Sequence, residues 1–468
     1  MRYHIWTLGC QMNTADSQLL ASELERHGHQ AVENWEEADI WVINTCVVRQ
    51  SAEDKAYGRL NQLHAIKKQH PDKIIGLMGC LVGVRDPLRL RKKLPYVDVF
   101  MPPSEPDAML AFLEDRGAEA DALALEAAAR ATREAIQDEE PRHDGTLILP
   151  EMERGSLVSA HVPVVYGCSH ACTYCIIPFR RGIERSRPVG EIVAHVRSLA
   201  RQGVKEITLL GQIVDRYGKD VPDGPDLSDL LHIVHDVAEE EGIERIRFLT
   251  SHPNWMNDRL LDTVAELPRV MPHIEVPNQA GDDEVLANMK RGYTAEDYRR
   301  LIHRIRERIP NVAIHTDIIV GFPGETAEQF QRTFDLLAEL KLDKAHIAKY
   351  SPRPHTVSAR RMPDDVPPEE KERRRKALDD LQQQIVAEIN ARYLGETVQV
   401  LFEEQHKGKW RGRTPQNKLV FVESERDLRG QVVDVEITWT GPWSMQGRLP
   451  EDAPLVADAS AITVRASR

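Results

Sequence analysis

Three cysteines within one short segment, Cys168, Cys172 and Cys175, have the spacing C-x3-C-x2-C, which predicts metal chemistry. A structural zinc ion needs four closed ligands. His170 could be the fourth, although its place inside the loop makes tetrahedral closure awkward. Three thiolates instead suit an iron–sulfur cluster that keeps one iron open for a substrate or cofactor.

The other three cysteines, Cys10, Cys46 and Cys80, lie far apart in the sequence, but each follows a short apolar segment. These segments are residues 3–8, 40–44 and 74–78, separated by helix-like stretches at 17–27 and 52–69. Alternating strands and helices predict a parallel α/β sheet, in which ligands gather at the carboxyl ends of the strands. We therefore expect the three thiols to converge as a second metal site. The alternative is three buried structural cysteines.

The composition is that of a multidomain globular protein. The chain has 468 residues, of which 41% are hydrophobic and 29% charged. Six cysteines in so long a chain exclude a dense disulfide framework. The absence of a long apolar run and of a secretory signal pattern predicts a cytoplasmic protein without a membrane span. A net charge of −13 argues against a surface coated in positive charge for nucleic acid, but it allows a local basic face.

We predict an α/β protein of three domains. The predicted units are a parallel α/β domain (1–115), a linker (116–150), a partial (β/α) barrel (151–385), a small β-barrel (386–450) and a tail (451–468). The Ala/Glu-rich linker is expected to be a solvated helix or flexible. The strands expected in the central domain are residues 161–166, 206–210, 245–250, 273–276, 313–320 and 344–349. Six strands are too few for a closed barrel of eight.

Two basic segments could face RNA. The last domain carries cations around one aromatic ring, namely Lys407, Lys409, Trp410, Arg411 and Arg413. This mixture is typical of phosphate contact with base stacking, and the alternative is a solvated hairpin with one packed tryptophan. The KERRRK run at 371–376 lies in a predicted long helix at 367–393, where a charge run is usually solvated surface.

The segment GCSHACTYCIIPFRRGIERSR (167–187) resembles the radical S-adenosylmethionine (SAM) signature of methylthiotransferases. That family also has three cysteines in its N-terminal domain, matched here by GCQMN (9–13), NTC (44–46) and GC (79–80). The C-terminal part resembles a TRAM domain, a small β-barrel that binds RNA. Within the family, GRTPQNKLVFVE (412–423) is most similar to the enzymes that modify N6-isopentenyladenosine in tRNA.

The resemblance implies two [4Fe–4S] clusters and SAM as cofactors. The cluster on Cys168, Cys172 and Cys175 would pass an electron to SAM, and the resulting 5′-deoxyadenosyl radical would attack the substrate. The second cluster, on the other three cysteines, would hold or supply sulfur, and a second SAM would donate the methyl group. The product would be the 2-methylthio derivative at tRNA position 37. The implied partners of this monomer are tRNA and an electron donor.

The resemblance also implies further site residues. The residues expected to contact SAM are Tyr174, Gly211, Gln212, Gln279, Ile319 and Gly321. For Tyr174, Gly211 and Gln212 the alternative is loop packing. Arg180 and Arg181 could hold substrate phosphates or form structural ion pairs. The sequence departs from the family pattern at Ile213, Asn278, Ala280 and His355.

Two other functions remain open from the sequence. One is a sister methylthiotransferase that modifies another tRNA adenosine derivative or an aspartate of a ribosomal protein. The other is a non-catalytic RNA-binding protein stabilised by zinc. The basic last domain disfavours the protein substrate, and the open three-cysteine spacing disfavours the zinc protein.

Overall fold

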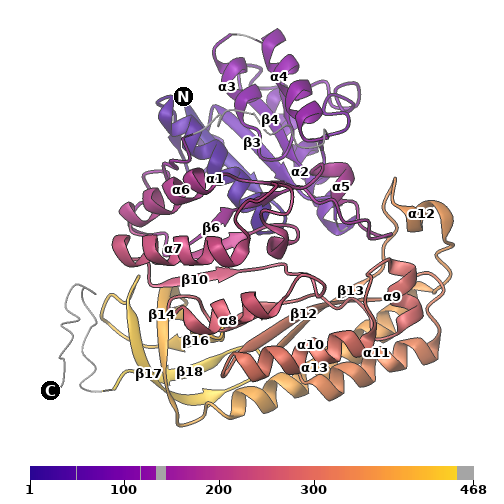
Figure 1. The fold of residues 1–468 in the computed structure, drawn as a ribbon. Helices are drawn as coiled ribbons and strands as arrows, with labels where there is room; N and C mark the ends of the chain where they lie inside the picture. The colour runs from indigo at the N-terminus through magenta and orange to yellow at the C-terminus, as the bar shows by residue number, and fades with distance from the viewer. Residues whose placement is uncertain (49, 116, 133–143, 451–468) are drawn as a thin grey trace.

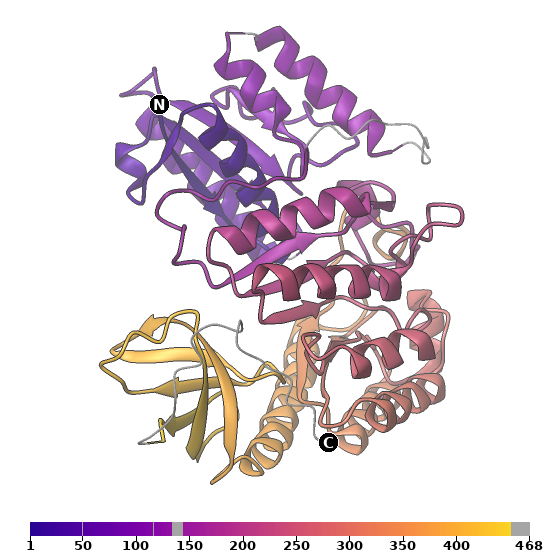
Figure 2. The ribbon, with the colours of Figure 1, turned by 60° about the vertical axis from the view of Figure 1, so that its left-hand side comes forward.

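A computed structural model describes residues 1–48, 50–115, 117–132 and 144–450. Figure 1 shows an N-terminal α/β domain at the top, a curved sheet with its helices in the middle and a closed barrel below. Figure 2 shows that the closed barrel and the N-terminal domain lie on opposite sides of the central domain. The predicted tail, 451–468, lies outside the described residues.

The N-terminal domain is built on a parallel sheet of order β2-β1-β3-β4-β5. Its strands are β1 (Arg2–Thr7), β2 (Gln30–Ala31), β3 (Ile40–Thr45), β4 (Ile74–Gly79) and β5 (Val99–Met101). Its helices are α1 (Gln11–Arg26), η1 (Trp35–Glu37), α2 (Gln50–Lys67), α3 (Asp107–Leu113) and α4 (Gly117–Arg130). Every residue of β3 is buried, as expected for a central parallel strand covered on both faces.

Helix α4 corrects the expectation of a solvated helix or flexible linker. Ala120 and Ala124, four residues apart on one helical face, are buried in the same apolar cluster as Met78 and Met101 of the sheet. Their small side chains allow the helix to approach the sheet closely. The Ala/Glu-rich composition had instead indicated a helix exposed to solvent. Residues 133–143 of the predicted linker lie outside the described part of the chain.

The central domain is a partial barrel, which confirms the predicted architecture. Its six parallel strands form two sheets, β10-β9-β6 and β11-β12-β13. The strands are β6 (Ser159–Pro163), β9 (Glu206–Leu210), β10 (Arg245–Phe248), β11 (His273–Glu275), β12 (Ala313–Val320) and β13 (Lys344–Lys349). The larger covering helices are α6 (Val189–Arg201), α7 (Leu227–Glu241), α8 (Asp258–Glu266), α10 (Ala295–Arg308) and α11 (Ala327–Leu340). The largest apolar core lies between these strands and helices.

Shorter elements complete the central domain and carry its loops. They are β7 (Val165–Tyr166), α5 (Ile177–Arg180), β8 (Arg185–Ser186), η2 (Val214–Arg216), α9 (Asp283–Met289) and α12 (Val357–Arg361). Helix α5 begins two residues after Cys175 and places Arg180 and Arg181 at its end. The loop that contains the C-x3-C-x2-C segment therefore leads directly into a short helix.

Helix α13 (Pro368–Ala391) leads to a closed barrel of order β14-β15-β16-β18-β17. Its strands are β14 (Thr397–His406), β15 (Lys409–Arg413), β16 (Leu419–Val422), β17 (Val432–Thr440) and β18 (Met445–Arg448). The guanidinium of Arg247 in β10 donates to the carbonyls of Pro415 at 2.8 Å and Thr414 at 2.9 Å. The turn between β15 and β16 is therefore attached to the partial barrel.

The charge run in α13 is not a free basic surface. Lys371 and Arg374 are buried, and Arg374 is paired with the buried Glu325 at 2.7 Å. The other two arginines of the run, Arg373 and Arg375, pair with acids of the same helix. The structure thus favours a structural role for this run over RNA contact.

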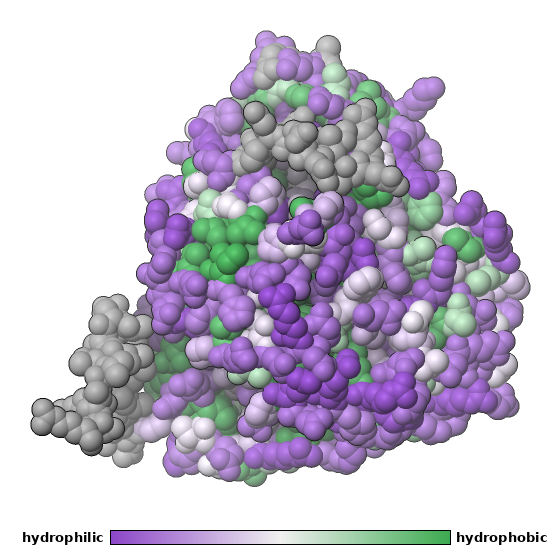
Figure 3. Space-filling view, viewed as in Figure 1, coloured by the Kyte–Doolittle hydropathy of each residue, from purple (hydrophilic) through white to green (hydrophobic). Residues whose placement is uncertain are grey.

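The surface is mostly hydrophilic on the face drawn in Figure 3. Among the described residues, none of the helices is both long and apolar enough to span a bilayer.

Candidate active site

The first cysteine set lies at one edge of the N-terminal sheet. Cys10, Cys46 and Cys80 follow the carboxyl ends of β1, β3 and β4, which are neighbours in the sheet. The backbone N–H of Cys80 donates a hydrogen bond to the Thr45 carbonyl at 2.8 Å. Burial raises the pKa of the Cys80 thiol to about 12, with Arg181 opposing this rise and the nearby thiols of Cys46 and Cys10 adding to it. The three thiols therefore lie at the same edge of the sheet and within electrostatic range of one another, and their role as metal ligands stays a prediction.

A buried polar network holds the loops of this first set. The amide of Asn13, in the first turn of α1, donates to the Asn44 side chain at 2.8 Å and to the Thr45 carbonyl at 3.1 Å. Asn44 donates in return to the Asn13 carbonyl at 2.7 Å and to Ser17 at 2.9 Å. Gly79 has a φ of 90°, and a Cβ there would lie 2.4 Å from Asn44 Oδ1. These bonds fix the loops after β1, β3 and β4 relative to one another.

The second cysteine set lies in one loop of the central domain, between β7 and α5. Thr173, inside the loop, donates to the carbonyls of Met289 at 3.1 Å and Asn288 at 2.8 Å, and its own carbonyl accepts from Ser358 at 2.9 Å. Segments from the end of α9 and the start of α12 therefore hold the loop. Because these partners are more than 100 residues away, the loop conformation depends on the tertiary fold.

The three thiols of this loop lie within electrostatic range of one another and of Arg291. Burial raises the pKa of Cys175 to about 12, and the neighbouring Cys172 and Cys168 thiols act in the same direction. Arg291 donates to the sulfur of Cys172 at 3.2 Å. The backbone N–H groups of His170 and Ile177 act against burial and lower the pKa of Cys168 and Cys175 respectively. Donors aimed at sulfur stabilise thiolate ligands, so this loop fits an anionic cluster.

The arrangement of the cysteines differs from that of a site that binds one metal ion. Within the described ranges, no three His, Cys, Asp or Glu side chains are gathered closely enough to hold one metal ion. A cluster does not need such a grouping, because each thiolate binds a different iron. The ring of His170, the possible zinc ligand, packs against His252 with 4.5 Å between ring centroids.

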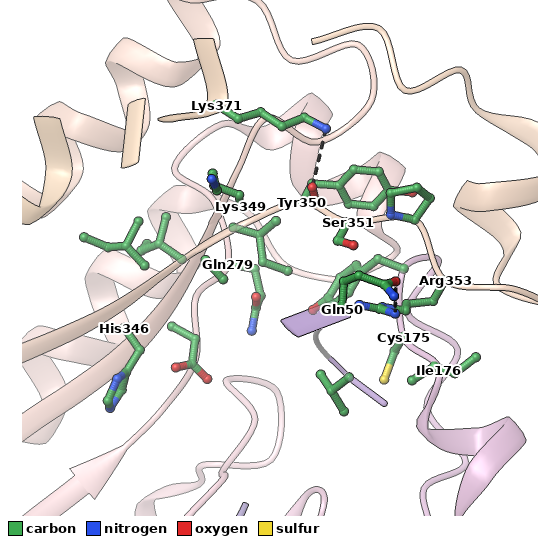
Figure 4. Close-up of a pocket in the computed structure, with 18 of the residues that line it drawn as sticks. Gln50, Cys175, Ile176, Gln279, His346, Lys349, Tyr350, Ser351, Arg353 and Lys371 are labelled. Atoms are coloured by element: carbon green, nitrogen blue, oxygen red, sulfur yellow. Dashed lines mark hydrogen bonds between the residues drawn. The ribbon is translucent and has the colours of Figure 1, made fainter. Parts of the chain in front are cut away.

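A cavity of about 720 Å³ connects the two domains beside the second cysteine set. Cys175 lies on one wall, and Val48, Gln50 and Ser51, from the segment after Cys46, lie on another. Figure 4 shows Cys175, Gln279 and Tyr350 around the same space. Arg353 lines it too and donates to Gln50 at 3.2 Å and Glu53 at 3.3 Å, which ties the loop after β13 to α2.

Three of the six residues expected to contact SAM line this cavity: Tyr174, Gln279 and Ile319. The other three, Gly211, Gln212 and Gly321, are not among its described lining residues. A Cβ on Gly211 would lie 3.0 Å from Val214 and 3.2 Å from Val165, which agrees with the loop-packing alternative. Gly321 has a φ of 69°, and a Cβ there would lie 2.3 Å from Lys371, a residue of the cavity wall.

The departures from the family pattern have visible structural effects. His355 has a φ of 76°, a left-handed conformation that glycine adopts at little cost, and its ring stacks on Phe179. Ile213 packs in an apolar cluster with Cys168 and Ile177. Ala280 is fully buried, and the Asn278 carbonyl accepts from the Tyr293 hydroxyl at 2.6 Å.

Arg181 does not face a substrate phosphate, because it is buried and paired with Asp16 of α1 at 2.8 Å. The structure thus corrects the RNA assignment in favour of the ion pair that the sequence left open. Arg180 is half-buried with its Cδ 3.1 Å from the position of a Cβ on Gly83. Burial lowers the pKa of Arg180, and the nearby Cys80 acts in the opposite direction. Both arginines therefore lie toward the first cysteine set.

The predicted RNA face of the last domain is only partly exposed. Trp410 is 3% exposed and lies in the core of the barrel, so it cannot stack on a base without unfolding the barrel. For Trp410 itself, the structure therefore shows the packed ring of the alternative. Lys409 pairs with Glu423, Arg411 with Glu403 and Glu404, and Arg413 with Glu403, whereas Lys407 lies exposed in the hairpin turn between β14 and β15.

Two exposed tryptophans were missed by the sequence analysis. Trp439 at the end of β17 is 48% exposed, and Trp443 in the following turn is 58% exposed. Tryptophan is enriched at interfaces, because its ring is apolar and its N–H can still find a hydrogen-bond partner. Their signal in the sequence is the segment WTGPW (439–443), where a Gly-Pro turn separates the two rings.

Three parts of the chain match known families. Residues 2–102 match the uncharacterized protein family UPF0004, residues 162–337 the radical SAM superfamily and residues 391–449 the TRAM domain. Among solved structures, the radical S-adenosylmethionine methyltransferase TsrM from Kitasatospora setae has a TM-score of 0.53 at 16% identity. The match covers 88% of this chain and 80% of that one, and it shows similarity of fold.

Curated relatives are much more similar in sequence. A tRNA-2-methylthio-N(6)-dimethylallyladenosine synthase of Roseiflexus is 49% identical over 96% of this chain and 89% of the relative. The synthase of Chloroflexus aurantiacus is 48% identical over 95% and 91%, and that of Dehalococcoides mccartyi is 43% identical over 96% and 98%. The chain therefore belongs to the radical SAM family of tRNA-2-methylthio-N(6)-dimethylallyladenosine synthases.

Proposed function

We propose that this protein inserts sulfur at C2 of N6-isopentenyladenosine, at position 37 of tRNA, and methylates it to the 2-methylthio product. The observation that carries this proposal is the cavity between the two cysteine sets. It is lined by Cys175 of one set and by the segment that follows Cys46 of the other. A base bound there can reach radical chemistry from one side and a sulfur donor from the other.

The two cysteine sets have separate roles in this proposal. Cys168, Cys172 and Cys175 would hold a [4Fe–4S] cluster with SAM on its open iron, and Cys10, Cys46 and Cys80 would hold a second [4Fe–4S] cluster. When bound, these groups supply the radical that removes hydrogen from the unactivated C2 and the sulfur that replaces it. Arg291 orients Cys172, and the Asn13–Asn44 pair orients the loops of the first set.

The cavity wall would position the substrate base. It is mostly apolar, with Ile176, Ile347 and Pro352 among its lining residues, so it suits a flat base that carries a prenyl group. Tyr174, packed edge-on against Phe322 with 6.4 Å between centroids, forms part of the same wall. Closure by both domains would also keep water from a reactive radical.

The C-terminal barrel would bind the tRNA outside the cavity. We assign the base-stacking role to Trp439 and Trp443, because both are exposed while Trp410 is packed in the core. Lys407 is the exposed cation of the predicted basic group and would contact a phosphate. Confined contacts of this kind agree with an acidic chain of net charge −13. We further propose that the protein acts as a cytoplasmic monomer with a separate electron donor.

The test is mass spectrometry of tRNA nucleosides from cells with and without this protein. We expect 2-methylthio-N6-isopentenyladenosine to disappear and N6-isopentenyladenosine to accumulate when the gene is deleted. Unchanged 2-methylthio nucleosides would remove the proposal. Loss of a different 2-methylthio-adenosine, or of a modified ribosomal aspartate, would instead identify a sister activity.

A further inference from the structure

Arg181 belongs to the central domain but lies beside the first cysteine set. It follows α5, six residues after Cys175, while its Nη2 donates to Oδ2 of Asp16 in the N-terminal domain at 2.8 Å. Asp16 lies in α1, the helix that begins directly after Cys10. Both side chains are at most 2% exposed. A single ion pair therefore connects the loop of one cysteine set to the helix that follows the other.

Asp16 satisfies only part of the Arg181 guanidinium. The Nε of Arg181 is buried and has no hydrogen-bond partner among the described residues. Buried N–H groups of charged side chains normally find an acceptor, because an unpaired one loses its bonds to water without replacement. Burial lowers the pKa of Arg181, but Asp16 and the thiols of Cys80 and Cys10 raise it overall. Arg181 thus keeps one unpaired donor, and its guanidinium lies within electrostatic range of these two cysteines.

A negatively charged group on the first cysteine set would satisfy this cation. An iron–sulfur cluster with three thiolate ligands carries net negative charge, and nearby donors and cations tune its reduction potential. Asp16 has the opposite sign and also acts on Cys80. Its other oxygen accepts from the Ser104 hydroxyl at 2.5 Å, which keeps the carboxylate in place.

We propose that Arg181 is a positioning residue that supplies the countercharge for the group bound by Cys10, Cys46 and Cys80. This inference rests on the proposed function, because it takes that group to be the sulfur-transferring cluster. One added electron increases the negative charge of the cluster by one, and Arg181 stabilises that charge while Asp16 opposes it. The central domain thereby sets a redox property of the N-terminal domain.

The experiment measures the first cluster by itself. Cys168→Ala, Cys172→Ala and Cys175→Ala are combined to remove the second set, and the protein is reconstituted with iron and sulfide without oxygen. The midpoint potential is then measured by dithionite titration followed by electron paramagnetic resonance. In this background we expect Arg181→Gln to lower the equilibrium constant for one-electron reduction about tenfold, which is a shift of about 59 mV to lower potential.

Charge variants separate this electrostatic role from a structural one. Arg181→Lys keeps the charge and should stay near the parent potential, while Asp16→Asn should shift it upward. The double variant Arg181→Gln with Asp16→Asn has the parent's net charge and should return toward the parent value. Arg130→Gln is the matched control, because it breaks another buried ion pair of the N-terminal domain, Arg130–Glu105 at 2.7 Å, without changing charge beside Cys80.

Each outcome decides the question. An unchanged potential in Arg181→Gln, or equal shifts in Arg181→Gln, Asp16→Asn and Arg130→Gln, would overturn the inference. If Arg181→Gln does not fold, the upward shift in Asp16→Asn and its absence in Arg130→Gln still test it. If the parent background binds no iron, the assignment of the first cysteine set in the proposed function fails, and the inference fails with it.

Discussion

The two cysteine sets of this protein use opposite means to bring three thiols together. The second set lies in one loop, so the short stretch of chain between its members keeps Cys168, Cys172 and Cys175 close together. Thr173 anchors that loop to α9 and α12. The first set comes from three strand ends and depends on the sheet and on a buried asparagine network. Each set also has one buried arginine, Arg291 in the second and Arg181 near the first. Only Arg181 comes from the other domain.

The difference teaches that one site can be built locally while its partner must be assembled. Residues around the second set can change while its three cysteines stay close together, because they lie in one loop. Any shift between β1, β3 and β4 would instead move the cysteines of the first set apart. The cavity joins them, because it includes Cys175 and the segment after Cys46. The relative position of the two domains is therefore part of the active site.

Loss of the local set should have the largest effect. Cys172→Ala removes one of three ligands, so we expect cleavage of SAM to 5′-deoxyadenosine to fall to the level of iron-free protein. Chromatographic detection of 5′-deoxyadenosine under reducing conditions measures this. Cleavage at the parent rate would contradict the assignment of this loop as the SAM-binding set.

Loss of a cysteine from the first set should affect SAM cleavage and formation of the methylthio product differently. Cys46→Ala should spare SAM cleavage and stop formation of the methylthio product, because the proposed function places only the sulfur-transferring cluster on Cys46. If the protein holds the two equal clusters that we propose, iron per chain should fall by about half. Retained methylthiolation of a tRNA substrate, measured by mass spectrometry, would refute the division of roles.

Loss of the Arg353 contacts that join the two domains should reduce activity less than loss of a cysteine. Arg353→Gln breaks the contacts with Gln50 and Glu53, so we expect methylthio product to fall about 10- to 100-fold from misplaced reacting groups. SAM cleavage should change much less, because Arg353 does not contact the C-x3-C-x2-C loop in any described hydrogen bond. The matched control is Arg201→Gln, which breaks an exposed pair with Glu241. Equal loss of both activities would argue against a role at the junction.

The smallest effect is expected farthest from both sets. Trp443→Ala should weaken tRNA binding about 5- to 150-fold, which corresponds to ~1–3 kcal/mol for one stacked base. Fluorescence anisotropy with a labelled anticodon stem-loop measures it, and Met152→Ala, another exposed apolar residue, is the control. An unchanged tRNA affinity in Trp443→Ala would argue against stacking on Trp443 and favour RNA contact at Lys407 and its neighbours. SAM cleavage should be unaffected.

Much of the fold was predictable because it depends on local patterns. Residues 40–44 and 74–78 were expected as strands, and β3 and β4 cover them and continue for one further residue at the carboxyl end. The expected strands at 206–210, 313–320 and 344–349 coincide with β9, β12 and β13. Apolar runs bounded by turn residues identify buried parallel strands well. Helix α4 was misjudged because alanine is compatible with both a solvated and a tightly packed helix.

The sequence by itself determined the two cysteine sets, the order of the domains and the resemblance to a radical SAM family. These features depend on residue type and on spacing along the chain, which no folding step can change. Only the tertiary structure decided that Trp410 is buried, that Trp439 and Trp443 are exposed and that Arg181 pairs with Asp16. The physical reason is that burial and ion pairing depend on distances between segments far apart in sequence, here 165 residues for Arg181 and Asp16.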